Sequence, residues 1–163
     1  MPPPTDERAV FGARLRTVLD RLAETVEAIP ERHIDERVLA DGNTPAIIVA
    51  HVTGSARGGV LAIGCGLEVD RDRVSEFAAE GGSPEVLAAG LRTLADELSA
   101  ALLDVPPGRL DEVTTPPQAI LGLVPQQEMA RRAGVLSTIA HASEHLGELM
   151  FIKDTFAERD ARG

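Results

Sequence analysis

Four long stretches of the sequence carry apolar side chains at the spacing of an α-helix. They cover residues 5–30, 44–65, 83–105 and 126–153. Apolar positions three and four residues apart line one helix face, and helices bury such faces by packing together as a bundle. Aromatic residues make up only 2% of the chain, so its core must consist of Leu, Val, Ile and Ala. That composition favours close helix packing over a β-sandwich. The sequence therefore predicts an all-α fold.

Capping residues mark where these helices begin. Thr5 is the predicted N-cap of the first helix, and Thr44-Pro45 and Ser83-Pro84 each combine an N-cap with proline at the first helical position. The charged segment 68–77 predicts a short connecting helix or an irregular crossover. The segment 106–125 contains five prolines and predicts a long connection before the last helix, which makes it a candidate lid or pocket wall.

Length and charge narrow the classes of protein. At 163 residues we expect a single domain, 1–163. A formal charge of -10 argues against nucleic acid as a partner, because phosphate binding needs a basic surface. The single cysteine, Cys65, excludes an internal disulfide and fits a reducing cytoplasm. We see no signal peptide and no apolar run of about 18 residues, so no membrane association is expected.

Two histidines in the last helix give the clearest chemical signal. His141 and His145 are four residues apart and therefore lie one turn apart on the same face, where both can bind one metal ion. Glu148 lies on the same side of a helical wheel as both histidines, at about −20° from His141 where His145 is at about +40°. It is the candidate general base or hydrogen-bond partner. Glu144 is the weaker candidate, and we expect it to be solvated.

His51, in the second helix, is the candidate third ligand. It lies on an apolar face that becomes small and glycine-rich after it, and those glycines predict either close approach of a neighbouring helix or room for a ligand beside His51. The same face is a candidate contact for a homodimer. Cys65 lies about 21 Å further along the helix axis, so we expect a buried structural thiol. His33 lies among charged residues and is predicted to be a solvated loop histidine.

The sequence resembles the DinB-like superfamily of helical bundles, which includes YfiT-type proteins and mycothiol-dependent maleylpyruvate isomerases. TPAIIVAHVTGS around His51 and IAHASEHLGELMF around His141 and His145 carry the resemblance. It implies a four-helix bundle of the DinB/YfiT-like type with a long connection before the last helix. It also implies that His51, His141 and His145 bind a divalent metal, which for imidazole ligands is Zn or Ni.

A three-histidine site leaves at least one coordination position open, as catalytic zinc sites do. That position can hold water for hydrolysis or the thiolate of a small-molecule thiol. The resemblance favours a mycothiol-type S-transferase or isomerase acting on an electrophilic substrate. A metal-dependent hydrolase and a non-catalytic, stress-associated metal-binding module are the alternatives. A basic or polar pocket mouth beside the histidines would favour an enzyme, and a filled core without a cavity would favour the module.

Overall fold

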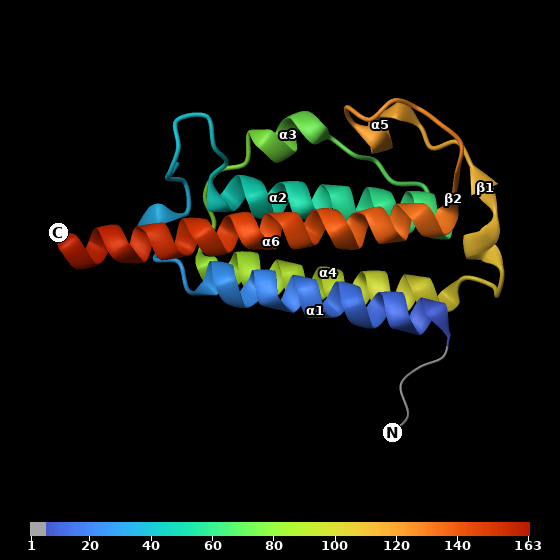
Figure 1. Ribbon diagram of the computed structural model, residues 1–163, viewed down its shortest axis with the longest axis horizontal. Helices are drawn as coiled ribbons and strands as arrows, with labels where there is room; N and C mark the ends of the chain where they lie inside the picture. The colour runs from blue at the N-terminus through green and yellow to red at the C-terminus, as the bar shows by residue number, and fades with distance from the viewer. Residues whose placement is uncertain (1–5) are drawn as a thin grey trace, which may run out of the picture.

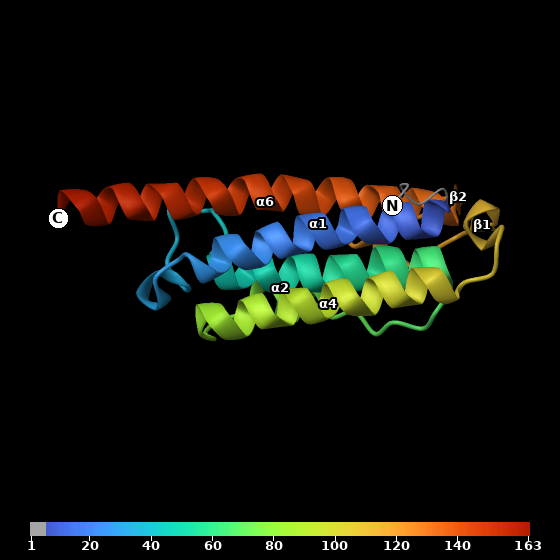
Figure 2. The same ribbon diagram turned by 90° about the horizontal axis from the view of Figure 1, so that it is seen from below.

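The computed structural model describes residues 6–163, and most of them are helical. The long helices α1 (Glu7–Glu27), α2 (Pro45–Ala56), α4 (Pro84–Asp104) and α6 (Arg131–Arg162) lie side by side. A π-helical segment, η2 (Arg57–Cys65), extends α2 without a break. Figure 1 and Figure 2 show this arrangement from two directions. The predicted all-α fold is confirmed.

The core lies between these helices. α1 packs against α4 and α6, and α2 with η2 packs against the same two helices from the other side. Its buried side chains are almost all Leu, Ile, Val and Ala, as the composition predicts, and Phe156 and Cys65 are the exceptions in the core cluster. Both helices that carry the candidate ligands, α2 and α6, are thus neighbours within one core.

Short elements complete the chain between the long helices. The outer side of α2 and η2 is covered by α3 and α5 (Figure 1). The strands β1 and β2 pair antiparallel, with Val113 opposite Ala130. The bounds are η1 (Glu31–His33), α3 (Arg73–Phe77), η3 (Arg109–Asp111), β1 (Val113–Thr114), α5 (Gln118–Leu121) and β2 (Met129–Ala130). The connecting helix predicted in 68–77 is present as α3.

Helix caps follow the sequence signals at two of three starts. The hydroxyl of Thr44 accepts from the backbone N–H of Ile47, and Ser83 caps α4 in the same way. Thr5, the predicted cap of the first helix, lies outside the described residues. The side chain of Asp6 caps α1 by accepting from the backbone N–H of Arg8.

The bounds of the last helix differ from the prediction of 126–153. Residues 126–130 do not form its first turn, because Met129 and Ala130 pair with β1. The helix also continues to Arg162. Its apolar stripe extends through Ile152 to Phe156, which is completely buried, so the core continues about one turn past Lys153.

The extension of α6 explains why the prediction of a solvated His33 is wrong. The side chain of His33 is only 9% exposed and stacks on the ring of Phe156, with ring centroids 4.3 Å apart. Its Nδ1 lies 2.6 Å from Glu36 Oε2 and its Nε2 lies 3.1 Å from Asp160. His33 therefore ties the loop after α1 to the last turns of α6, far along the chain.

Neighbouring parts of the chain fill the space beside the glycines of the second helix. A Cβ on Gly59 would lie 1.9 Å from Thr138 Oγ1 of α6, and one on Gly64 would lie 2.8 Å from Val135. A Cβ on Gly54 would lie 1.9 Å from Glu76 Oε1 of α3. Close approach of neighbouring elements, the first of the two predicted explanations, accounts for these three positions. A homodimer stays a prediction, and it would have to use another surface.

Within residues 6–163, one helical segment, Pro45–Cys65, is long and apolar enough to cross a membrane by length and composition alone. In the most apolar 18-residue stretch of this segment, 61% is buried inside the protein. It packs between α4 and α6 and carries His51 toward α6, which is what a core helix does.

Candidate metal centre

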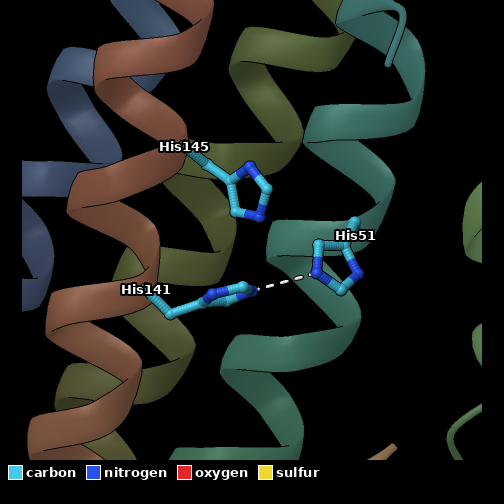
Figure 3. Close-up of side chains that lie close together, drawn as sticks. All are labelled: His51, His141 and His145. Atoms are coloured by element: carbon cyan, nitrogen blue, oxygen red, sulfur yellow. Dashed lines mark hydrogen bonds between the residues drawn. The ribbon is translucent and has the colours of Figure 1, made fainter. Parts of the chain in front are cut away.

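Three histidines meet between α2 and α6. His51 comes from α2, His141 and His145 come from α6, and each offers a ring nitrogen within 4.8 Å of the other two. The rings point toward one another in Figure 3, and the Nε2 atoms of His51 and His141 are 2.9 Å apart. The structure thus brings together the three candidate ligands that the sequence singled out.

Local structure directs each ring inward. Thr44 caps α2 and fixes its start, so that His51 lies on the face packed against α6, where it is buried. On α6, the four-residue spacing places His141 and His145 one turn apart, with ring centroids 4.5 Å apart. Close approach of α6 at Gly59 brings the two helices near enough for the rings to meet.

A buried ion pair holds His51 from behind. Glu76 Oε2 lies 2.9 Å from His51 Nδ1, and Arg71 donates to both oxygens of the same carboxylate. Burial raises the pKa of Glu76, but the hydrogen bonds from Arg71 and His51 outweigh it and leave the pKa below its usual value. Burial lowers the pKa of His51, and the bond to Glu76 offsets only part of that shift. Glu76 is therefore ionised and His51 neutral near pH 7.

Sequence reasoning missed Glu76 and Arg71. Both lie in the charged segment that we expected only to connect helices, 25 and 20 residues after His51 in the chain. The one available hint is Gly54, one turn after His51, where a side chain would displace the Glu76 carboxylate. A glycine in a helix interior indicates a close neighbour but does not identify it.

A second carboxylate holds His145. Glu148 Oε2 lies 2.8 Å from His145 Nδ1, and Asn43 donates to Glu148 Oε1 over 3.2 Å. Of the two roles predicted for Glu148, this geometry favours the hydrogen-bond partner. Its role as a general base stays a prediction.

Among residues 6–163, His141 has no such buried partner. The nearest carboxylate oxygen, of Glu144, is 4.0 Å from its Nδ1, and the Glu144 side chain is 79% exposed, as expected for a solvated acid. Burial lowers the pKa of His141 to about 4, with further lowering by His145 and His51. His141 is therefore also neutral near pH 7, which is the form that binds metals.

The hydrogen-bond pattern leaves nitrogen lone pairs facing the centre of the cluster. An ionised carboxylate only accepts, so the Nδ1 atoms of His51 and His145 carry their ring protons and their Nε2 atoms carry lone pairs. The three ligand atoms lie close enough for one ion, whose bonds to imidazole nitrogen are about 2.0–2.1 Å long. Carboxylates behind ligand histidines are the usual outer support of protein metal sites. The residues fit a divalent cation.

A cavity of about 370 Å³ opens beside the cluster. His51 and His141 form part of its wall, together with Arg71, Arg73 and residues from η2 and α6. The connection 106–125 and the residues after it supply much of the remaining wall, including Ile120, Leu123 and Val124. Of the two roles predicted for the connection, lid or pocket wall, the structure agrees with the wall.

Cys65 is separate from this site. It is 6% exposed and belongs to the core cluster, and burial raises its pKa to about 11. It is not one of the residues that line the cavity. The predicted buried thiol agrees with this placement, and Cys65 is unsuited to act as a nucleophile.

A family model described as the DinB superfamily matches residues 14–149, a range that includes all three histidines, Glu76 and Glu148. A search of the curated proteins finds no match.

Proposed function

The chain belongs to the DinB superfamily, and on that premise we propose that it is a four-helix bundle enzyme that binds a divalent metal through His51, His141 and His145. The convergence of three imidazoles beside a cavity carries this proposal. Zinc and nickel both suit three nitrogen ligands.

Each protein group has a distinct task in this proposal. His51, His141 and His145 hold the ion, while Glu76 and Glu148 fix the orientation and tautomer of two of the rings. When bound, the ion supplies a positive charge that favours the thiolate form of a small-molecule thiol at neutral pH. The cavity beside His51 and His141 positions the second substrate.

We propose S-transfer from a mycothiol-type thiol to an electrophile. The thiol releases its proton to solvent, its sulfur forms a new bond to carbon of the electrophile, and the leaving group departs with the electron pair of the broken bond. In an isomerisation the same sulfur would add and later leave. Cys65 takes no part, since it is buried in the core and away from the cavity.

The surroundings of the histidines support an enzyme over a non-catalytic module. A module with a structural site would have a filled core around its ligands. Here a cavity with two arginines adjoins two of the three histidines. Such a combination of a concave pocket, perturbed titratable groups and convergent polar side chains is typical of active sites.

Thiol consumption tests the proposal. Purified protein would be loaded with zinc or nickel and mixed with mycothiol and an alkyl halide, and free thiol would be followed over time. We expect turnover with the metal, none after chelation, and recovery on adding metal back. Product release from ester or amide substrates without thiol consumption would indicate a hydrolase instead. No metal-dependent reaction of either kind would contradict the enzyme assignment.

A further inference from the structure

The wall of the cavity differs in charge from the rest of the protein. The chain carries a formal charge of -10, with 26 acidic residues and 16 basic ones. Yet the residues lining the cavity include two arginines, Arg71 and Arg73, and neither Asp nor Glu. A concave site with walls of one charge sign concentrates ligands of the opposite sign. The cavity therefore favours an anion.

The two arginines are not equivalent. Arg71 is fully engaged, because it binds both oxygens of Glu76 and donates to the carbonyl oxygen of Ile120. Arg73 has no carboxylate partner among residues 6–163. Most arginines in that part of the chain have one, and the others without are Arg14, Arg21 and Arg37, none of which lines the cavity.

Arg73 is also held in position. Its guanidinium lies over the ring of Phe77, 4.7 Å from the centroid, and the same ring lies 4.7 Å from the centroid of His51. Its side chain passes Gly122, where a Cβ would lie 3.2 Å from Arg73 Cδ. Gly122 has a φ of +64°, which also favours glycine. The cation is thus fixed near the metal centre without being neutralised.

The part of the wall next to Arg73 is apolar. The end of α5 and the chain after it contribute Leu121, Leu123 and Val124 to the cavity. Leu123 is 85% exposed and Val124 is 50% exposed, so these side chains gain little from packing within the chain. Burying them against an apolar ligand would stabilise a complex.

From this pairing of a free cation with an uncovered apolar wall, we propose that the cavity binds a small monocarboxylate with an apolar body. The carboxylate pairs with Arg73, and the apolar part lies against Leu121, Leu123 and Val124. The inference rests on the proposed function only in treating this ligand as the electrophilic substrate. Binding itself requires no metal.

Two probes of equal size separate charge from shape. Octanoate and octanamide have the same chain, but only octanoate carries a charge at pH 7.5. Each would be titrated calorimetrically into the full-length protein, once loaded with zinc and once after chelation. We expect octanoate to bind about tenfold more tightly than octanamide in both forms, because a bond between charged groups outweighs a neutral one.

Arg73→Gln tests the residue, and Arg14→Gln is its matched control. Arg14 is exposed on α1, which contributes no residue to the cavity. Its replacement by Gln removes the same single positive charge as Arg73→Gln. The preference for octanoate should disappear in Arg73→Gln and persist in Arg14→Gln. Equal binding of octanoate and octanamide by the unmodified protein would overturn the proposal. A preference for octanoate that survives in Arg73→Gln, or that changes equally in Arg73→Gln and Arg14→Gln, would also overturn it.

These outcomes are distinct from failure of the proposed function. If the protein binds no metal but Arg73→Gln abolishes the preference for octanoate, the carboxylate site stands and the enzyme assignment fails. If the metal is bound and thiol is consumed while octanoate shows no advantage, only the substrate class is overturned.

Discussion

At the scale of residues, metal binding by the cluster requires imidazole rings that are uncharged and correctly oriented. Burial disfavours the charged ring, and the lowered pKa of His51 and His141 follows from it. The carboxylates of Glu76 and Glu148 then bind the Nδ1 protons and leave Nε2 free. Two of the three rings are fixed this way, and His141 at the cavity is the one with more freedom.

Glu148→Gln should weaken metal binding about tenfold, since outer partners of ligand histidines typically contribute that much to affinity. The amide still accepts a hydrogen bond but lacks the charge. Glu144→Gln, with the same loss of charge on the same helix, should leave the affinity near that of the unmodified protein. Competition with a chelator of known affinity measures both. Equal weakening by the two changes would show that only overall charge matters.

At the scale of elements, the glycines of the second helix reduce its intrinsic helical stability but allow neighbouring elements to approach closely. Glycine inside a helix costs up to about 1 kcal/mol relative to alanine. At Gly54 that cost leaves space for Glu76, and at Gly59 it leaves space for α6. The π-helical geometry of η2 begins directly after α2, and such segments often occur near functional sites.

Gly54→Ala should destabilise the protein by about 1–3 kcal/mol despite the better helix propensity of alanine, because the new Cβ would overlap Glu76. Gly90→Ala on α4 is the control, since a Cβ there meets nothing within 4 Å. It should stabilise by about 0.5–1 kcal/mol. Denaturant unfolding followed by circular dichroism measures both. Stabilisation by both substitutions would contradict the role assigned to Gly54.

The elements show how far the sequence predicts the structure. Caps at Thr44 and Ser83, helical spacing and the histidine pair are local signals, and each is found where the sequence places it. Glu76, Arg71 and the burial of His33 depend on packing between segments distant in the chain, which local patterns do not encode. The extended end of α6 is not predicted for the same reason, because Phe156 stacks on His33, which lies far from it in the chain.

At the scale of the whole molecule, stability and the metal centre are linked through pH. Without metal, the folded protein keeps His141 neutral down to about pH 4, whereas the unfolded chain protonates it near its ordinary pKa of 6.5. The unfolded state then binds more protons in this interval, so the free energy of unfolding should fall as pH drops from about 6.5 toward 4. The sign is opposite to that of a histidine stabilised in its charged form.

Chemical denaturation of the metal-free protein at pH 7 and pH 5 measures this dependence. Glu36, Glu76 and Asp160, whose pKa values hydrogen bonding holds low, should contribute at more acid pH than the histidines. His141→Gln should therefore flatten the change between pH 7 and 5. An unaltered slope in this variant would mean that His141 does not supply the coupling.

The fold as a whole serves to bring one residue of α2 and two of α6 to a common point beside a cavity. Elemental analysis of tag-free protein, with His51→Ala and His145→Ala beside it, tests this claim most directly. We predict about one zinc or nickel ion per chain in the unmodified protein and loss of the ion in both variants. Absence of metal after reconstitution, or full retention of metal by a variant, would contradict the three-histidine site.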